Sequence, residues 1–403
     1  MKKVYKKAQV IVKVVERCNL ACSYCYYFEG GDQSYKNKPP IMSLETAREL
    51  ADFLAQGVAD LGLRAVAIAL HGGEPFLLKP ALLDGICTVL RERLEGICEL
   101  SIDAQTNGTV MNEALLAVVR KHAIQVSFSV DGLEQAHDRE RRDHRGRGSF
   151  QRIRENYIEW SRFNRDEGLP EIPIIAVLDA RNDYGDVLTG LAQDLGVRRF
   201  NFLLPDCCHD DGIPNGNTAR DYGRVLCEIF DAWAETDDVG VREVDQLLGR
   251  FQLASQREGV VEDSSVIHHE NQILVVRSDG ELQIDDTYIP ASEWRNALPV
   301  MSLRHTSLRE YLSLQVFEDI DAIANELPDQ CERCVWKNIC HGGDIENRYS
   351  SERGFDNPSV YCEGLRMFFR HAVKFLRRNG YPAEVIADRL RATGGSHQFR
   401  YAR

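Results

Sequence analysis

Three closely spaced cysteines follow the first predicted strand of this 403-residue chain. Cys18, Cys22 and Cys25 come directly after a β-branched run, Gln9–Val15. Thiolates at this spacing bind either zinc or an iron–sulfur cluster. Structural zinc needs four ligands, and because no histidine precedes His71, a zinc site here would need a distant fourth ligand. Three thiolates on a four-iron cluster leave one iron open, and an open metal position is available for chemistry.

A second group of cysteines lies near the C-terminal end of the sequence and consists of Cys331, Cys334, Cys340 and Cys362. The first three have the spacing of a metal-binding knuckle, and the fourth follows far enough away to close the site from another segment. Four thiolates satisfy a tetrahedral zinc site and also an iron–sulfur cluster. The spacing alone leaves both alternatives open.

The protein has 12 cysteines, and we expect them to be reduced. The N-terminal lysines and the apolar run after them are similar to a signal peptide, but Lys13 interrupts the run and no small-residue cleavage site follows. No stretch approaches the roughly 18 apolar residues of a membrane span. We therefore predict a cytoplasmic protein with no membrane partner, in which metal or cluster ligation explains the cysteines better than disulfides do.

A regular frame that could position these cysteines covers residues 1–240. Strand-like segments alternate there with helix-like ones, and this order forms right-handed βαβ units and a parallel sheet. The six predicted strands are Gln9–Val15, Arg64–Leu70, Ile97–Gln105, Ile124–Val130, Pro173–Leu178 and Arg199–Leu204. Later the pattern changes to a β-hairpin, Ile273–Arg277 and Glu281–Ile284, around a Ser-Asp-Gly turn.

Glycines and polar side chains follow three of these strands. The carboxyl ends of parallel strands meet at one edge of a sheet, where barrel active sites form. Glycine lets the backbone approach a ligand closely, although two adjacent glycines alone indicate only a turn. The residues concerned are Gly72, Gly73 and Glu74 after the second strand, Thr106 and Asn107 at the third, and Ser129 and Asp131 at the fourth.

The three-cysteine motif, with Tyr24 before its last cysteine, resembles the radical S-adenosylmethionine (SAM) superfamily. The resemblance implies an α/β fold, a partial (β/α)6 TIM-like barrel. It implies that Cys18, Cys22 and Cys25 hold a 4Fe–4S cluster whose open iron is chelated by the amino and carboxylate groups of SAM. An electron from the cluster then cleaves SAM to a 5′-deoxyadenosyl radical. The electron comes from an external one-electron reductant, similar to flavodoxin or ferredoxin.

The resemblance also implies which residues contact SAM. The Gly-Gly-Glu-Pro segment at residues 72–75 would contact its amino group, and residues near Ser129 its ribose and adenosine. Arg141 would bind its carboxylate, with Arg142 as the alternative. We predict a cofactor-binding set of Tyr24, Gly72, Gly73, Glu74, Thr106, Asn107, Ser129, Asp131 and Arg141.

The second cysteine group resembles the SPASM extension of peptide-modifying radical enzymes, which carries auxiliary iron–sulfur clusters. A full SPASM domain binds two clusters, but two of the ligand positions of the first are Asp285 and Asp344 here. Carboxylates are poor replacements for thiolates on a soft cluster. We therefore predict one auxiliary 4Fe–4S cluster, on Cys331, Cys334, Cys340 and Cys362.

Asp286, in the predicted hairpin region, stands where sulfatase-maturing relatives place a catalytic aspartate. A carboxylate that faces a buried cavity takes a substrate proton as the radical is oxidised. We predict this catalytic role for Asp286. The alternative is an ordinary surface carboxylate.

The whole sequence resembles maturases of ribosomally made peptides (RiPPs). The segments 203–206, Leu-Leu-Pro-Asp, and 354–358, Gly-Phe-Asp-Asn-Pro, look most like the cyclophane-forming branch. This resemblance implies a precursor peptide as partner. It also implies that hydrogen abstraction from a side-chain β-carbon is followed by a C–C crosslink from that carbon to an aromatic ring.

Three other functions stay open. A thioether-forming or epimerising peptide maturase would use the same radical. An anaerobic sulfatase-maturing enzyme, which makes formylglycine, would normally carry two auxiliary clusters, and Asp285 and Asp344 argue against it. The third alternative is a metal-binding module without turnover, which zinc analysis would identify.

Composition and the order of segments complete the prediction. The net charge of −13 argues against a nucleic-acid partner, since such proteins carry a basic excess. We predict a radical SAM barrel at 1–240, a linker at 241–270, a SPASM-like domain at 271–370 and a helical extension at 371–403.

Overall fold

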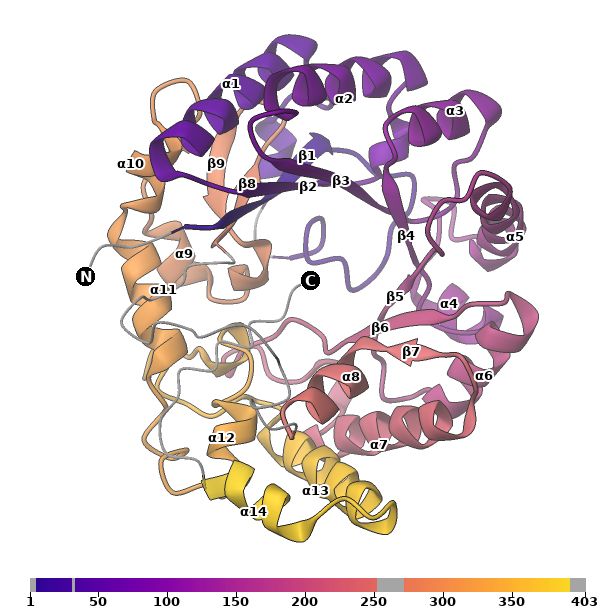
Figure 1. The fold of residues 1–403 in the computed structure, drawn as a ribbon, viewed down its shortest axis with the longest axis vertical. Coiled ribbons are helices and arrows are strands. Elements are labelled where there is room, and N and C mark those ends of the chain that lie inside the picture. The colour runs from indigo at the N-terminus through magenta and orange to yellow at the C-terminus, as the bar shows by residue number, and fades with distance from the viewer. Residues whose placement is uncertain (1–4, 31–32, 252–271, 392–403) are drawn as a thin grey trace.

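The computed structural model describes residues 5–30, 33–251 and 272–391. Its centre is one ten-stranded sheet with the strand order β10-β9-β8-β1-β2-β3-β4-β5-β6-β7. Neighbouring strands from β1 to β7 are parallel and curve into an arc, with helices on its outer side (Figure 1). The strands are β1 (Lys7–Val15), β2 (Ala65–Gly72), β3 (Glu99–Thr106), β4 (Gln125–Ser129), β5 (Ile174–Val177), β6 (Arg199–Leu203) and β7 (Gly240–Val241). This confirms the predicted α/β fold and its partial barrel.

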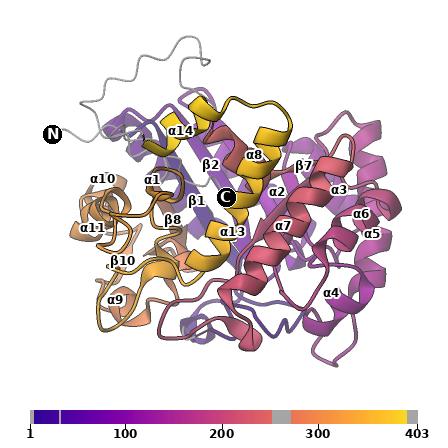
Figure 2. The same cartoon turned by 90° about the horizontal axis from the view of Figure 1, so that it is seen from below.

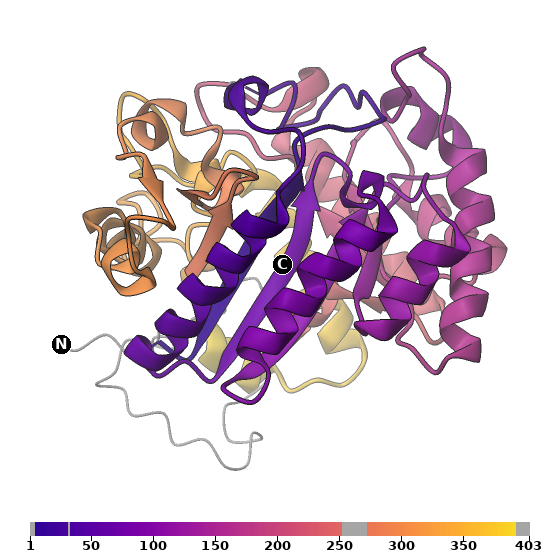
Figure 3. The same ribbon diagram turned by 90° about the horizontal axis from the view of Figure 1, so that it is seen from above.

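Four of the seven outer helices in the described part of the sequence, α1, α3, α6 and α7, begin at a residue whose side chain caps the helix. Ser43 Oγ accepts the Thr46 amide at 3.0 Å, and Asn112 and Thr218 cap their helices in the same way. Two of these helices lie side by side over β1 and β2 (Figure 3). The helices are α1 (Leu44–Leu61), α2 (Pro80–Leu94), α3 (Glu113–Lys121), α4 (Glu134–Glu140), α5 (Phe150–Asp166), α6 (Tyr184–Asp194) and α7 (Ala219–Glu235).

A β-hairpin from the C-terminal part of the sequence extends the same sheet. Strand β8 (Gln272–Val276) lies parallel to β1, and β9 (Glu281–Ile284) returns antiparallel to β8. The short β10 (Met301–Ser302) pairs with β9. The hairpin is therefore continuous with the barrel and places the turn after β8 beside the end of β1, where the Ser278 amide donates to Glu16.

The remaining helices close the open side of the arc (Figure 1). Helix α10 (Leu308–Leu312) packs on α1 at the β1 end of the arc. Helix α13 (Cys362–Arg378) packs on α7 at the β7 end, where α7 and α13 lie side by side (Figure 2). These remaining helices are α8 (Arg242–Gly249), α9 (Ser292–Asn296), α10 (Leu308–Leu312), α11 (Gln315–Asn325), α12 (Lys337–Cys340), α13 (Cys362–Arg378) and α14 (Ala383–Arg391). Short 3₁₀ turns are η1 (Ser34–Asn37), η2 (Pro75–Leu77), η3 (Pro214–Gly216), η5 (Asp286–Tyr288) and η6 (Glu346–Arg348).

Both helix contacts depend on small residues. At the contact of α10 with α1, a Cβ on Gly57 would lie 2.5 Å from the Leu308 side chain. At the contact of α13 with α7, a Cβ on Gly364 would lie 2.1 Å from the carbonyl oxygen of Ala219. Phe230 of α7 then packs edge-on against rings of α13. The C-terminal part is thus fixed at both ends of the arc.

Most of the predicted linker, including its most polar stretch at 255–265, falls outside the described residues, and α8 occupies its first part. Residues 392–403 of the predicted helical extension also lie outside. No helix in the described ranges is long and apolar enough to cross a membrane.

Candidate functional site

The three-cysteine loop leaves β1 at the carboxyl edge of the sheet and is held against the segment after α4. The Ala21 amide donates to the Arg142 carbonyl at 2.7 Å. Cys22 is buried, whereas Cys18 and Cys25 are half-buried. Cys18 Sγ accepts the Leu20 amide at 3.4 Å. The backbone that carries the three sulfurs is therefore held by β1, which it follows, and by the segment after α4.

The two glycines that follow β2 pack against this loop. The Gly73 amide donates to the Val15 carbonyl at 2.7 Å. A Cβ on Gly72 would lie 2.0 Å from that same oxygen, and one on Gly73 would lie 2.0 Å from the Arg17 carbonyl oxygen. Gly72 also has a φ of 130°, a conformation that favours glycine. The close approach that requires glycine here is to the backbone that leads into Cys18.

Glu74 connects the carboxyl ends of β2 and β3. Its buried carboxylate accepts the Thr106 hydroxyl at 2.8 Å and the Asn107 amide at 2.6 Å. Burial raises the pKa of Glu74 to about 7, although these hydrogen bonds lower it. Asn107 Nδ2 in turn donates to Cys18 Sγ at 3.6 Å. The predicted residues of the second and third strands thus form one cluster with Cys18.

Tyr24, Asp131 and Arg141 form a second polar cluster beside the loop. The Tyr24 hydroxyl donates to Asp131, and Arg141 Nη1 donates to the Tyr24 hydroxyl at 2.5 Å. Arg141 also lies 3.7 Å from the Asp131 carboxylate, which accepts the Val177 amide at 3.2 Å. Burial raises the pKa of Asp131. The structure therefore brings Asp131, which follows the fourth strand, to the same loop.

The groups around the loop fit an iron–sulfur cluster and SAM. Burial raises the pKa of the Cys18 thiol to about 12, and the charges of Glu74, Cys22 and Cys25 raise it further. Amide donors to a sulfur, as at Cys18, are typical of cluster ligands. Among the described residues no group accepts a hydrogen bond from the buried Nε of Arg141. An unpaired guanidinium donor suits a carboxylate.

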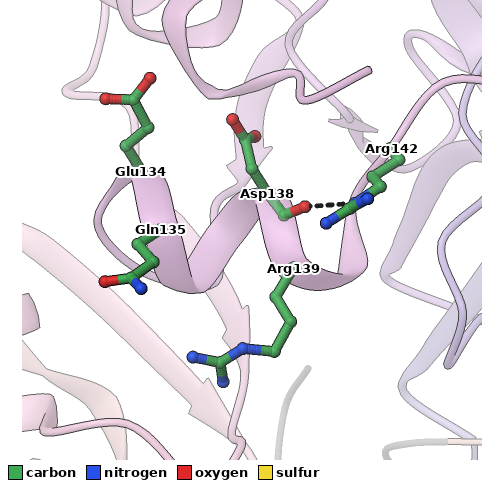
Figure 4. Close-up of a pocket in the computed structure, with 5 residues that line it drawn as sticks. All are labelled: Glu134, Gln135, Asp138, Arg139 and Arg142. Carbon is green, nitrogen blue, oxygen red and sulfur yellow. Dashed lines mark hydrogen bonds between the residues drawn. The ribbon is translucent and has the colours of Figure 1, made fainter. Parts of the chain in front are cut away.

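Arg142, the alternative to Arg141, points elsewhere. It lines a hollow over α4 with Glu134, Gln135, Asp138 and Arg139 (Figure 4). Its Nε donates to the Asp138 carbonyl oxygen at 2.7 Å. Of the two arginines, only Arg141 contacts Tyr24 and Asp131.

A series of hydrogen-bonded polar side chains crosses the inner face of the sheet from Ser129 to Lys13. Gln105 Nε2 donates to Ser129 Oγ at 3.3 Å, and Gln105 Oε1 lies 3.3 Å from His71 Nε2. His71 Nδ1 lies 3.2 Å from Lys13 Nζ. The Lys13 ammonium then forms an ion pair with Asp286. Asp286 is 5% exposed, so the predicted catalytic carboxylate lies inside the barrel and not on the surface.

Sequence reasoning missed Lys13, His71 and Gln105 as site residues. Lys13 is fully buried, although the sequence suggested only an interruption of an apolar run. The signal was present: a charged residue inside a β-branched strand of a parallel sheet, which is buried on both faces, must have a buried partner.

The second cysteine group also comes together. Burial raises the pKa of Cys340 to about 12; Arg250 lowers it, and the charges of Cys362, Cys331 and Cys334 raise it further. Cys340 ends α12, and Cys362 begins α13. In residues 5–30, 33–251 and 272–391, no three Cys, His, Asp or Glu side chains are arranged to hold a single metal ion. In a four-iron cluster each thiolate binds a different iron, which suits a more widely spaced set.

Two aspartates occupy the positions that a second auxiliary cluster would use. Asp285 Oδ1 accepts the Thr287 amide at 3.2 Å and so caps the 3₁₀ turn η5. The Asp344 carbonyl oxygen accepts the Asn347 amide at 3.2 Å. The capping bond of Asp285 fixes the backbone that carries Asp286.

Comparison with known proteins agrees with this geometry. Residues 12–170 match the family model of the radical SAM superfamily. The protein is 22% identical over 360 residues to a cysteine-type anaerobic sulfatase-maturating enzyme of Clostridium perfringens, covering 88% of this protein and 93% of that enzyme. It is 23% identical over 395 residues to a serine-type anaerobic sulfatase-maturating enzyme of Bacteroides thetaiotaomicron, covering 92% and 91%.

Solved structures give the same fold. Native anSMEcpe with bound AdoMet superposes with a TM-score of 0.75 at 19% identity, covering 93% of this protein and 99% of that one. The same protein with bound AdoMet and Cp18Cys peptide also has a TM-score of 0.75. Both of those structures contain bound AdoMet, and the likeness shows that this protein shares their fold. The family match and the cysteine loop at the end of β1 identify residues 12–170 as a radical SAM region, within an enzyme that shares its fold with these structures.

Proposed function

We propose that this enzyme oxidises a side chain of a precursor peptide by two electrons and joins its β-carbon to an aromatic ring. The observation that carries the two-electron oxidation of a side chain is the position of Asp286. It lies inside the barrel, and the hydroxyl of Tyr26, the residue after the last cysteine of the loop, donates to it at 3.3 Å. A proton acceptor therefore lies beside the loop that would hold the cluster.

In this proposal the protein holds its cofactors with the residues described above. Cys18, Cys22 and Cys25 would bind the 4Fe–4S cluster, which supplies, together with SAM, the radical that removes a hydrogen atom from the peptide. Arg141 would bind the SAM carboxylate through its unpaired Nε. The segment 72–74 would lie along the amino group, with Thr106 and Asn107 fixing Glu74.

The role of Asp286 follows from the electron count. Crosslinking replaces one C–H bond at the β-carbon and one C–H bond of the ring by a C–C bond, so after the first hydrogen atom a proton and an electron remain to be removed. Asp286 would accept the proton as a carboxylate. Cys331, Cys334, Cys340 and Cys362 would hold an auxiliary cluster, which supplies an acceptor for the electron.

The second candidate is formylglycine formation. The relatives reported above are named as sulfatase-maturating enzymes and match over about nine-tenths of the sequence. This reaction is also a two-electron oxidation of a side chain, and Asp286 would serve it equally. The aspartates at positions 285 and 344, in place of thiolates, favour crosslinking over it.

The test uses reconstituted enzyme with SAM, dithionite and peptides encoded beside its gene, together with sulfatase-type peptides. We expect a peptide that has lost two hydrogens per motif, contains no aldehyde that reacts with a hydrazide, and resists fragmentation within the crosslinked ring. An aldehyde would establish formylglycine formation. Loss of a free thiol would establish a thioether, and an unchanged mass with altered chirality would establish epimerisation.

Variants assign the two cysteine groups in the same assay. Cys18→Ala should abolish 5′-deoxyadenosine formation. Cys334→Ala should retain it and lose the peptide product. Cys87→Ala is the matched control, because Cys87 is a buried residue of the α1–α2 core, far in sequence from both groups. Iron and sulfide analysis of Cys18→Ala and Cys334→Ala distinguishes one cluster at each site from zinc.

A further inference from the structure

Lys13 occupies an unusual position for a lysine. It lies on β1, is 0% exposed, and lies opposite His71 in the register of β1 with β2. Moving an ammonium out of water is costly unless its three protons find acceptors. Lys13 Nζ contacts three: the Asp286 carboxylate, His71 Nδ1 at 3.2 Å and the Tyr26 hydroxyl at 3.4 Å.

These contacts fix the direction of the whole series of hydrogen bonds. An ammonium group can donate hydrogen bonds but cannot accept one. His71 Nδ1 must therefore accept from Lys13, and His71 Nε2 must carry the ring proton. Nε2–H then donates to Gln105 Oε1, and Gln105 Nε2 donates to Ser129 Oγ. Lys13 therefore orients every member from Asp286 to Ser129.

The charges around Asp286 make Lys13 its principal counter-ion. Burial raises the pKa of Asp286, but the charge and hydrogen bond of Lys13, with smaller contributions from His71 and from Arg295 of α9, together lower it below its ordinary value. Burial and Lys13 also lower the pKa of His71 to about 3, so the ring is neutral at neutral pH. The other titratable groups that face Asp286 are Tyr26 and Tyr27 of the cysteine loop.

We infer that Lys13 is a positioning residue that holds Asp286 as a carboxylate directed into the barrel, ready to accept the substrate proton. The inference rests on the proposed function for that last step. The ionised state of Asp286 is a property of the protein alone and is testable without a peptide.

The experiment compares Lys13→Met, which removes the charge, with Lys13→Arg, which keeps it. Lys38→Met is the matched control, because Lys38 also pairs with hairpin carboxylates, Asp279 at 2.8 Å and Glu281, but does not contact Asp286. Infrared spectra of protein with ¹³C-labelled aspartate report the state of Asp286. We expect the carbonyl band of a protonated carboxyl group to appear at neutral pH in Lys13→Met and in none of the other proteins.

A double variant, Lys13→Met with Asp286→Asn, assigns the band, which must disappear in it. The double variant also removes both buried charges, so no unpaired charge remains in its interior. It can therefore be studied if Lys13→Met alone is too unstable. No protonated band in Lys13→Met, or an identical band in Lys38→Met, would overturn the inference.

Turnover provides the second measurement. We expect the yield of modified peptide per 5′-deoxyadenosine to fall about tenfold or more in Lys13→Met at neutral pH, since proton transfer by a positioned group contributes about 10²–10⁴-fold. The yield should recover as pH rises through the increased pKa of Asp286, and Lys13→Arg should restore it at neutral pH. An unchanged yield and pH profile would refute the inference. Failure of the wild-type enzyme to modify any peptide would refute the proposed function and leave the infrared result intact.

Discussion

Glu16 and Arg277 form a double ion pair in the interior that joins the end of β1 to the turn after β8. Arg277 Nε and Nη2 each donate to one oxygen of Glu16, both at 3.0 Å. The side chain of Glu16 is 0% exposed and that of Arg277 is 1% exposed. The Tyr27 hydroxyl also donates to Glu16. The hairpin that carries Asp286 is therefore tied directly to the segment that leads into the three-cysteine loop.

This pair predicts a strong and specific effect on stability. Arg277→Met leaves a buried carboxylate without its counter-ion, and loss of one partner of such a pair costs about 3–5 kcal/mol. Adding Glu16→Gln removes the unpaired charge, so the double variant should unfold at higher urea than Arg277→Met alone. Urea unfolding followed by circular dichroism measures both. A double variant no more stable than the single one would show that the charge is not the cause.

His71 predicts how stability depends on pH. Its pKa is about 3 in the folded protein, because burial and Lys13 oppose protonation, against 6.5 for an ordinary histidine. Between these values the unfolded protein binds a proton that the folded protein does not, so the free energy of unfolding must fall as the pH decreases. The slope is at most about 1.4 kcal/mol per pH unit.

His71→Gln isolates this effect, because glutamine has no proton to gain. We expect the wild-type protein to lose stability relative to His71→Gln as the pH falls below about 6.5. Urea unfolding of both proteins at a series of pH values measures the difference. If the free energies of unfolding of the two proteins changed in parallel with pH, the imidazole of His71 would be protonated in the folded protein as readily as in the unfolded one.

Much of the barrel could be predicted from the sequence because its signals are local. The strand predicted at 9–15 and the structural β1 differ by two residues at one end, since β-branched residues run through it. The helix α4 and the strand β7 escaped prediction. The seven residues of α4 bury only His137, and β7 has two residues, so neither has an apolar period to detect.

The pairing of β8 with β1 and the role of Lys13 could not be predicted for a different reason. Both depend on a hairpin that follows β1 by more than 250 residues, and no local pattern reports such a contact. The three-cysteine motif indicated the edge of the sheet correctly. It did not indicate that the inner face behind that edge is polar from Lys13 to Ser129.

The two neighbouring arginines predict opposite effects on cofactor binding. Arg141 is buried beside Tyr24 and Asp131, with Nε unpaired among the described groups, whereas Arg142 lies over α4. If Arg141 binds the SAM carboxylate, Arg141→Met should raise the KM for SAM about 10- to 100-fold, because a hydrogen bond to a charged group contributes about 1.5–3 kcal/mol. Arg142→Met should leave it unchanged. Initial rates of 5′-deoxyadenosine formation measure both, and equal effects would contradict the assignment.

Gly364 predicts a link between helix packing and the second cysteine site. It lies two residues after Cys362, where α13 crosses α7, and a Cβ there would overlap the Ala219 carbonyl oxygen at 2.1 Å. Gly364→Ala must therefore push the two helices apart, at a cost of about 1–3 kcal/mol. The displacement moves Cys362 away from Cys340, so we expect iron bound at this site to decrease while 5′-deoxyadenosine formation continues.

Gly249→Ala is the matched control for this substitution, because Gly249 is also helical and a Cβ there meets nothing within 4 Å. Alanine in a helix is favoured over glycine by up to about 1 kcal/mol, so this variant should be as stable as the wild type or slightly more stable. Iron and sulfide content, read beside urea unfolding, distinguishes loss of the second site from general unfolding. Full iron content in a destabilised Gly364→Ala would mean that the four sulfurs do not depend on the crossing of α7 and α13.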